Sequence, residues 1–228
     1  MTAVAKKSPR SLAIVAAAGC VHLLMLSVPV LLIRGLPSAT GDPRLLLFLF
    51  LASFWFGLES VASQNEPLRL TGTSDRPWLE LEIGGAILVT FWICVLSVPP
   101  ANRSDLGMTT AIGAALMVVG ATSRWLSIRT LGKFFLNDVA VVPGQPLMTQ
   151  GIYRVVRHPS ELGTLCLVLG AVTLRESMSG LIAFLVLLLP GVLRRTRLED
   201  AVLRSHHPVA FALYACDVGG LIPRFRRG

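Results

Sequence analysis

Residues 151–174 of the chain read GIYRVVRHPSELGTLCLVLGAVTL, and this stretch decides how the rest is interpreted. Its first part, Gly151 to Gly163, contains two arginines, a histidine and a glutamate, whereas Thr164 to Leu174 is almost entirely apolar. Charged groups are costly to hold near lipid, so polar residues at such a boundary are candidates for a functional site. The stretch therefore predicts a polar site at the place where a membrane-embedded helix meets water.

The composition of the whole chain is typical of an integral membrane protein. Hydrophobic residues make up 53% of the 228 residues, charged residues make up only 15%, and the mean hydropathy is +0.67. A helix needs about 20 mostly apolar residues to span a bilayer. We therefore expect an all-α integral membrane protein with about six transmembrane helices, at residues 12–33, 45–63, 79–99, 108–128, 160–174 and 178–193.

The first and the last of these segments need separate interpretation. Basic residues precede the first segment, as they do in a secretory signal, but the segment is too long for a signal and further apolar segments follow. We expect it to be retained as a helix. The last two segments are short and are separated only by Arg175, Glu176 and Ser177, which predicts a tight helical hairpin.

The Lys and Arg residues are distributed unevenly over the loops of this six-helix arrangement. If the N-terminus is inside, only four of the 21 basic residues fall on the outer side, and the remaining 17 fall on the inner side. Cytoplasmic loops of membrane proteins carry an excess of Lys and Arg. The bias predicts that both termini and the stretch from Gly151 to Gly163 are cytoplasmic. The four outer residues are Arg34, Arg44, Arg103 and Arg175.

The net charge of +8 does not indicate a nucleic-acid-binding protein, because the basic residues lie at helix ends and interleave with the apolar segments. Anionic lipid headgroups are better partners for such residues. The cysteines form no CxxC pair and the histidines do not cluster, so we expect neither a metal site nor a disulfide framework. The residues concerned are Cys20, Cys94, Cys166 and Cys216, with His22, His206 and His207 outside the central stretch.

The polar features are concentrated in the second half of the chain. We interpret residues 1–107 as an N-terminal unit of three membrane helices and residues 108–228 as a catalytic half. In the first half, Glu59 could line a pocket within the bundle or reach water at the headgroups, and we favour the second interpretation. Between residues 129 and 151, glycines and prolines predict a long irregular loop, and such loops often bind ligands.

This loop and the motif that follows it resemble the isoprenylcysteine carboxyl methyltransferase family. That family carries the pattern GxYxxxRHPxYxG, followed after a hairpin by Arg-x3-Glu-Glu-x2-Leu. In this chain, the residues from Arg195 to Leu203 resemble the second pattern, and Glu199 and Asp200 stand at its two acidic positions. Both patterns in the expected order are more specific than either alone. The first part of the resemblance rests on Trp125, Leu131, Gly132, Phe134, Val139, the approach from Leu147 to Gly151, and the residues Arg157, His158, Pro159 and Gly163.

The chain departs from the family in two places. Ser160 and Glu161 stand where the family has a variable residue and a tyrosine, so a carboxylate replaces an aromatic side chain. The basic, tyrosine-rich stretch of the family is replaced by SHHPVAFALY at residues 205–214, and only residues 221–223 are similar to the family's ending. We therefore expect the cofactor site to be preserved more closely than the acceptor site.

The resemblance implies an S-adenosylmethionine-dependent methyltransferase that acts on a membrane-embedded, lipid-like or prenylated acceptor. Such a transfer depends mainly on positioning, and the free N–H groups in the first turn of a helix can receive an anion such as the cofactor's carboxylate. Aromatic rings at Trp125, Phe134 and Tyr153 could cover the adenine or the sulfonium. The implied cofactor-binding residues are Tyr153, Arg157, His158, Pro159, Gly163, Glu199 and Asp200, and the implied catalytic residues are Arg195, Glu199 and Glu161.

The chemistry of the acceptor decides the role of Glu161. A carboxylate acceptor needs no general base, because it is already ionised near neutral pH, and Arg195 could neutralise and orient it. Glu161 would then point away or pair with Arg154 or Arg157. An amine, phenol or thiol acceptor would need a base, and Glu161 could serve as one. We favour the carboxylate, with membrane N-, S- or phenol O-methylation as the alternative.

Two other classes of protein fit the sequence less well. An NADPH-dependent reductase of the sterol-reductase type has a C-terminal half of similar architecture, but the long body of such an enzyme is missing here. A non-enzymatic membrane scaffold or transporter would leave the paired motifs unexplained. No inverted repeat is visible, which also argues against transport.

Overall fold

The computed structural model describes residues 9–34, 41–63, 77–97, 106–135, 139, 141 and 144–224. Helices account for all of its regular structure in these residues except one isolated bridge between Val156 and Gly219. The helices are α1 (Pro9–Arg34), α3 (Pro43–Ser63), α4 (Pro77–Leu96), α5 (Met108–Leu131), α6 (Pro159–Leu174), α7 (Met178–Ala183), α8 (Leu189–His206) and α9 (Pro208–Asp217), with the short helical turns η1 (Gly132–Phe134), η2 (Gly151–Arg154) and η3 (Phe184–Leu188).

Each of the six apolar segments predicted from the sequence falls on a helix, and the all-α prediction is confirmed for the described residues. Three helical stretches are long and apolar enough to cross a membrane, namely Pro43–Ser60, Met108–Leu131 and Met178–His206. Helices α4 and α6 offer shorter apolar stretches. The structure thus supports a membrane protein with three candidate spans, while the count of six remains a prediction.

The last predicted segment was too short. It was expected to end near residue 193, but the helical stretch continues through α8 to His206. Pro190 lies in the first turn of α8, directly after the π-helical turn η3, and the helix passes this proline without ending. The charged residues beyond position 193 end the apolar run but not the helix, so α8 carries its polar end out to the second motif.

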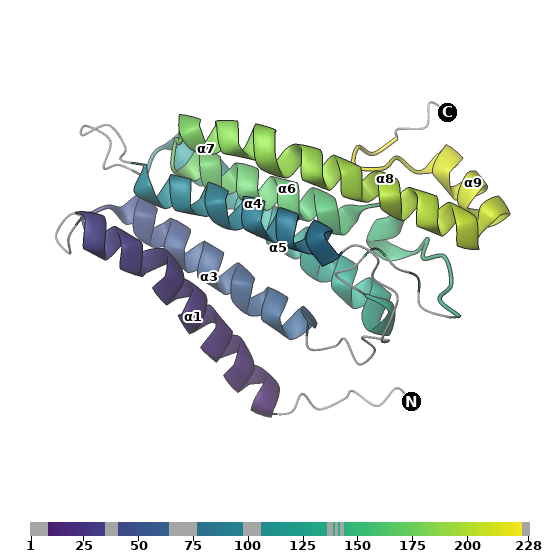
Figure 1. Ribbon diagram of the computed structural model, residues 1–228, viewed down its shortest axis with the longest axis horizontal. Helices are drawn as coiled ribbons and strands as arrows, with labels where there is room; N and C mark the ends of the chain where they lie inside the picture. Colours follow the sequence, from purple (N-terminus) through teal and green to yellow (C-terminus); the bar gives the residue numbers. More distant parts are fainter. Residues whose placement is uncertain are drawn as a thin grey trace.

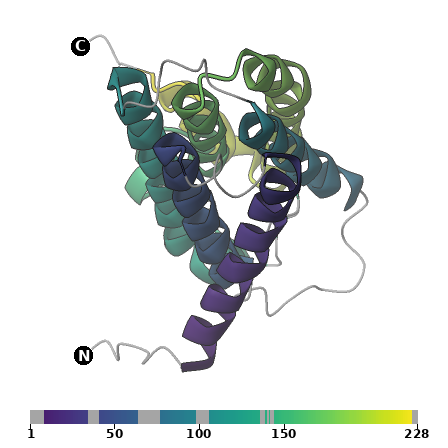
Figure 2. The same cartoon turned by 90° about the vertical axis from the view of Figure 1, so that its left-hand side faces the viewer.

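The long helices lie side by side in a bundle, with α1 and α3 on one side and α5, α6 and the α7–α8 stretch on the other (Figures 1 and 2). Helix α9 lies beyond the body of the bundle, beside the last part of α8 (Figure 1). Residues of both halves of the chain, from Phe48 and Phe91 to Leu167 and Leu188, form one hydrophobic core. The predicted division at residue 107 is therefore not a gap in the packing.

Helices α5 and α6 approach each other closely along four glycines. A Cβ atom added at Gly113 would lie 2.7 Å from the backbone oxygen of Gly170, and one at Gly120 would lie 2.5 Å from that of Gly163. The seven-residue spacing on both helices pairs the glycines in antiparallel order. Small residues allow such contact between membrane helices, and this contact fixes where α6, and therefore the motif at its start, lies against α5.

The end of the bundle opposite to α9 is joined by buried charges. Arg175 is 1% exposed, and its Nη1 donates to Asp42 at 2.9 Å. Its Nε donates to the carbonyl oxygen of Cys94 at 3.2 Å, and its Nη2 donates to that of Ser97 at 3.0 Å. The predicted hairpin between α6 and α7 is confirmed. Its arginine, Arg175, binds the hairpin to the start of α3 and to the end of α4.

Candidate active site

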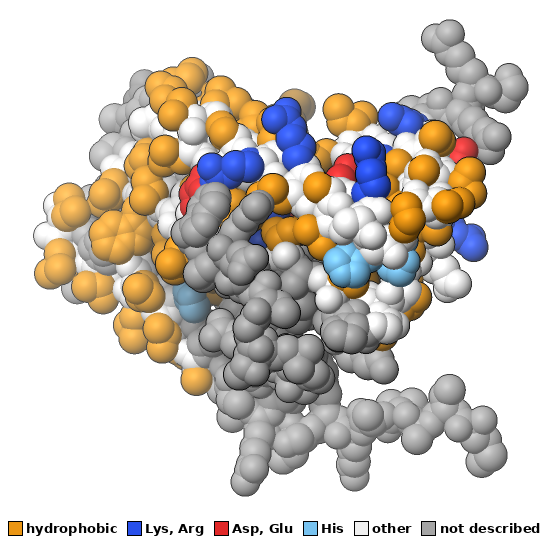
Figure 3. Space-filling view, turned by 45° about the vertical axis from the view of Figure 1, so that its right-hand side comes forward, with side chains coloured by type: hydrophobic (Ala, Val, Ile, Leu, Met, Phe, Trp, Pro, Cys, Tyr) orange, Lys and Arg blue, Asp and Glu red, His pale blue; other side chains and the backbone are white. Residues whose placement is uncertain are grey.

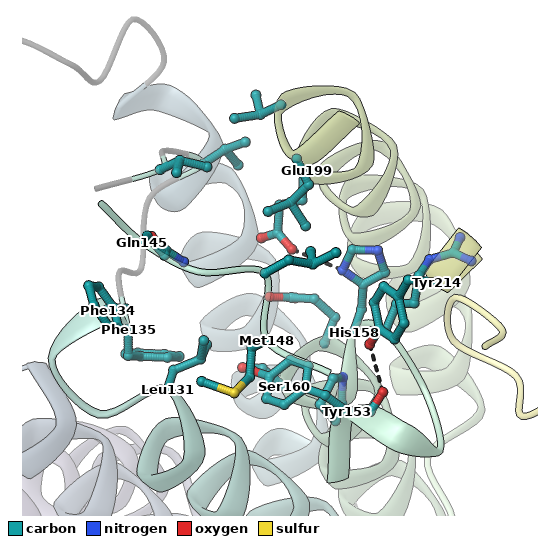
Figure 4. A pocket seen from close by; sticks show the side chains of 18 of the residues that line it. Leu131, Phe134, Phe135, Gln145, Met148, Tyr153, His158, Ser160, Glu199 and Tyr214 are labelled. Carbon is teal, nitrogen blue, oxygen red and sulfur yellow. Dashed lines mark hydrogen bonds and ion pairs between the residues drawn. The ribbon is translucent and has the colours of Figure 1, made fainter. Parts of the chain in front are cut away.

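A pocket opens where α6 begins and the polar part of α8 lies. Its wall combines apolar side chains with a few charged ones, which is the usual composition of a small-molecule site. The end of α5 and the segment after it supply apolar side chains, including Leu131, Phe135 and Met148, while α6 and α8 supply charged ones (Figure 4). On the surface, hydrophobic side chains dominate the left of the view in Figure 3, and most of the visible basic side chains lie along its upper middle and right.

His158 stands at the centre of the charged side and is 4% exposed. It is the residue before Pro159, which occupies the first position of α6, where a proline is well tolerated. Its Nδ1 lies 3.0 Å from Glu199 Oε2 and its Nε2 lies 2.8 Å from Asp200 Oδ1. Burial lowers the pKa of His158, but the hydrogen bonds to Asp200 and Glu199 outweigh it and raise the pKa to about 9. His158 is therefore an imidazolium near neutral pH, with both ring nitrogens donating.

Arg157 is used mainly to hold the C-terminal segment. Its Nη1 donates to the carbonyl oxygen of Val218 at 2.7 Å and its Nη2 donates to Asp200 at 2.8 Å. Its backbone N–H donates to the carbonyl oxygen of Gly219, and that of His158 donates to Gly220. Arg157 lines the pocket, but its guanidinium ties α8 and the segment after α9 to the motif.

Arg195 is held from one side only. Its Nε lies 3.0 Å from Glu199 Oε1 and 3.1 Å from Glu161 Oε1, so two carboxylates flank one N–H group. Within the described part of the chain, neither Nη1 nor Nη2 of Arg195 has a hydrogen-bond partner. The side chain is 10% exposed and lines the pocket. A guanidinium with its two terminal amino groups unengaged can bind a carboxylate through two parallel hydrogen bonds.

Tyr153 and Tyr214 line the pocket and contact each other. The hydroxyl of Tyr214 donates to the backbone oxygen of Tyr153 at 2.6 Å (Figure 4). Burial, with the charge of Glu199 nearby, raises the pKa of Tyr153 well above its usual range. The Tyr153 phenol is therefore neutral at physiological pH, and it can supply an aromatic face or a hydrogen bond but not an anion.

A second group of charges lies behind the start of α6, and the sequence reasoning missed it. Arg124 of α5 pairs with both carboxylate oxygens of Glu59 in α3. The same guanidinium donates from Nη1 to Ser160 Oγ at 2.8 Å. The Glu59 side chain is only 20% exposed, so our preferred interpretation of Glu59 as a headgroup-reaching residue was wrong. Arg124 was the available signal, because an arginine inside an apolar helix needs a buried partner.

The structure brings most of the predicted site residues to one pocket. Gly163 is an exception, because it packs against Gly120 and Arg124 of α5 and not at the pocket. Asp200 lies behind His158 and does not line the pocket. Glu161 pairs with Arg195, and not with Arg154 or Arg157 as expected for a carboxylate acceptor. Trp125 lies outside the lining, under the guanidinium of Arg129. The predicted residues that line the pocket are Phe134, Tyr153, Arg157, His158, Pro159, Glu161, Arg195 and Glu199.

Comparison with known proteins points to the same part of the chain. Residues 108–208 match the profile of a family described as phospholipid methyltransferase. A probable protein-S-isoprenylcysteine O-methyltransferase of Oryza sativa subsp. indica is 25% identical over 114 residues, which are 49% of this chain and 60% of the relative. Protein-S-isoprenylcysteine O-methyltransferase A of Arabidopsis thaliana is 27% identical over 113 residues, which are 49% of this chain and 57% of the relative.

The chain thus spans about three-fifths of the length of these curated relatives. The matched region contains α5, α6, the hairpin and α8, which are the elements that build most of the pocket. In this second half the chain is similar to the phospholipid methyltransferase family and to isoprenylcysteine O-methyltransferases, and the second of these similarities is the one that the two motifs predicted.

Proposed function

We propose that this protein is an S-adenosylmethionine-dependent methyltransferase that methylates a carboxylate on a membrane-embedded, prenylated or lipid-like acceptor. The similarity to isoprenylcysteine O-methyltransferases supports the reaction class. The observation that carries the choice of acceptor is Arg195, whose Nε is fixed by two carboxylates while its terminal amino groups face no partner among the described residues. That arrangement leaves a two-pronged donor for an acceptor carboxylate.

The residues of the pocket fit S-adenosylmethionine. Its sulfonium supplies an electrophilic methyl group, and its tail carries an ammonium and a carboxylate. Glu199 can accept a hydrogen bond from an ammonium or a ribose hydroxyl, and the unpaired N–H groups of the first turn of α6 can donate to a carboxylate. Phe134 and Tyr153 present aromatic faces on the pocket wall. The imidazolium of His158 orients Glu199 from behind, with Asp200 holding its other nitrogen.

The chain needs no nucleophile or base of its own for a carboxylate acceptor. A carboxylate is ionised near neutral pH, so the protein has only to bind it, turn one oxygen towards the methyl group and exclude water. Arg195 performs the binding and the turning in this proposal. Glu161 and Glu199 fix the guanidinium from the Nε side.

One observation favours a second candidate. Glu161 is a carboxylate with 5% exposure that lines the pocket at the position of the family tyrosine. If the acceptor is a neutral amine, phenol or thiol, Glu161 takes up the proton that the acceptor loses. The two candidates share the cofactor and differ only in whether the charge of residue 161 is needed.

We also propose six membrane helices with both termini in the cytoplasm, which places the pocket at the cytoplasmic face. The antiparallel packing of α5 and α6, and the return of α8 to the start of α6, support an alternating topology. A single cysteine at Ser8 or Gly228, in a variant without the native cysteines, tests it in intact cells. Labelling of either residue from outside would contradict the topology.

Cofactor binding tests the reaction class most simply. Purified protein in detergent is titrated by calorimetry with S-adenosylmethionine and, separately, with NADPH. We expect heat of binding for S-adenosylmethionine, and a weaker signal in a His158→Ala variant that remains folded. Binding of NADPH without binding of S-adenosylmethionine would favour a reductase and contradict the proposal.

A further inference from the structure

The pair of Glu59 and Arg124 is a contact between the unmatched first half of the chain and the pocket. Arg124 uses Nε and Nη2 for the two oxygens of Glu59, which is the two-pronged geometry of a strong ion pair. The Arg124 side chain is 13% exposed and that of Glu59 is 20% exposed, and both residues lie within candidate membrane spans. Holding such a pair away from water is costly, so we expect the pair to serve the structure of the bundle or the site.

The remaining amino group of Arg124 reaches the start of α6. Nη1 donates to Ser160 Oγ at 2.8 Å and also approaches Thr164 Oγ1 at 3.4 Å. The neighbouring residue of α5, Ser123, donates to the carbonyl oxygen of Pro159 at 2.9 Å. These contacts hold the first turn of α6 against α5.

Arg124 also lies directly behind the pocket wall. Its guanidinium sits over the ring of Phe135 at 5.9 Å, and both Phe135 and Ser160 line the pocket. The next residue, Glu161, flanks the Nε of Arg195. A rotation of this first turn would therefore move the carboxylate that fixes Arg195, as well as the wall beside it.

The His158 side of the pocket has hydrogen bonds of its own. Its ring is held by Glu199 and Asp200 of α8, and its backbone N–H donates to Gly220. None of these contacts involves α3 or Arg124. A change at Glu59 should therefore reach Arg195 through Ser160 and Glu161 while it leaves the surroundings of His158 in place.

We propose that Glu59 and Arg124 are positioning residues for the acceptor, through which the first half of the chain fixes the first turn of α6. Glu59 orients the guanidinium, Arg124 holds Ser160, and the turn presents residue 161 to Arg195. This role rests on the proposed methyl transfer to a carboxylate. It assigns to α3 a part in the site that the matched region does not contain.

The test is a double-mutant cycle of Glu59→Gln and Ser160→Ala, with acceptor KM, kcat and the Kd of S-adenosylmethionine as separate readouts. The matched control is Glu82→Gln, because Glu82 of α4 pairs with Arg194 of α8 and so also joins the two halves, but neither residue lines the pocket. We expect Glu59→Gln to lower kcat/KM for an S-prenylcysteine acceptor about tenfold or more, since small misplacements of a reacting group are costly.

Cofactor affinity separates positioning from a general loss of structure. We expect the Kd of S-adenosylmethionine to stay within about threefold in Glu59→Gln, and all readouts to stay within about twofold in Glu82→Gln. The double variant should be no worse than the more affected single variant, because both changes break one chain of contacts. If Glu59→Gln does not fold, Arg124→Lys replaces it, since a lysine keeps the charge beside Glu59 but lacks the fork that reaches Ser160.

Three results would overturn the positioning role. The first is a kcat/KM for the acceptor within about twofold of wild type in folded Glu59→Gln. The second is a loss of affinity for S-adenosylmethionine as large as the loss of kcat/KM. The third is a double variant in which the effects of the two single changes multiply. A wild-type protein that transfers no methyl group to any carboxylate acceptor would contradict the proposed function instead. The two failures are therefore distinguishable.

Discussion

Both ends of the helical bundle carry buried arginines, but they use them differently. At one end, Arg175 places Nε, Nη1 and Nη2 on three separate protein acceptors. At the other end, Arg195 places only Nε on protein carboxylates, and its terminal amino groups have no partner in the described parts of the chain. The protein itself supplies acceptors for every nitrogen of the Arg175 guanidinium. The two terminal amino groups of Arg195 are left for a ligand in the pocket.

The difference separates a structural charge cluster from a functional one. Removing a charge from water is costly in both places, and the protein's own acceptors compensate for that cost only where the guanidinium is fully engaged. A partly engaged guanidinium in a pocket is stabilised further when a ligand supplies the missing acceptors. We therefore expect changes at Arg175 to affect folding and changes near Arg195 to affect binding and turnover.

The largest effect is expected at Arg175. Arg175→Met keeps most of the side-chain volume but leaves Asp42 without its arginine, so it should lower the free energy of unfolding by roughly 3 to 5 kcal/mol. Thermal or denaturant unfolding in detergent measures the loss. Any folded fraction should bind S-adenosylmethionine with the wild-type Kd. Weaker cofactor binding at unchanged stability would show that Arg175 is not a purely structural residue.

The next effect concerns the charged side of the pocket. Glu199→Ala removes a charge-assisted hydrogen bond to the cofactor, and His158→Ala removes the one that orients Glu199. Each should weaken cofactor binding by roughly 1.5 to 3 kcal/mol, or about one to two decades in Kd. Calorimetry with S-adenosylmethionine measures the change, and size-exclusion chromatography monitors the fold. Unchanged affinity in both variants would mean that the cofactor does not bind here.

A pH titration sharpens the same point. The pKa of His158 is raised to about 9, so the stability contributed by the imidazolium is fully present below about pH 6.5 and is lost as the pH rises through about 9. Between pH 7 and 9.5 the free energy of unfolding should fall by at most about 1.4 kcal/mol per pH unit from this group. The fall should be absent in His158→Asn, and an equal fall in that variant would assign it to another residue.

The sequence predicted the helices well where apolar runs and helices coincide. The prediction from hydropathy failed for the end of α8, where the apolar run stops but the helix goes on. Thirteen residues of mixed polar and apolar character follow the apolar run within α8. A hydropathy pattern does not reveal a helix that continues outside the lipid. The motif residues His158, Arg195 and Glu199 were correctly expected to meet, since the hairpin returns α8 to the start of α6. Gly163 was assigned to the cofactor because a motif does not say which helix face a residue occupies.

The pair of Glu59 and Arg124 could not be derived from spacing, because its partners are 65 residues apart on different helices. A charged residue in an apolar segment shows that a partner is needed, but not which residue it is. The pairing of Glu161 with Arg195 was missed for the same reason. Local patterns identify the elements and the motif, whereas contacts between helices depend on packing such as the glycine contact of α5 and α6.

The smallest effect is expected at Glu161. Glu161→Gln keeps an oxygen beside Arg195 Nε and removes one negative charge beside the carboxylate that is to be methylated. With a carboxylate acceptor, turnover should therefore stay within about threefold of wild type or rise, with cofactor affinity unchanged. A fall in kcat of about a hundredfold or more would instead assign the role of general base to Glu161 and favour a neutral acceptor.

The most direct test of the account is the chemical nature of the methylated product. Wild-type protein in lipid nanodiscs is incubated with methyl-labelled S-adenosylmethionine and an S-prenylated cysteine whose carboxylate is free, beside the same compound with the carboxylate converted to an amide. We predict label in the lipid fraction only with the free carboxylate, and its release as methanol by mild alkali, as a methyl ester requires. Label that resists alkali, or equal labelling of the amide, would contradict a carboxylate acceptor bound at Arg195.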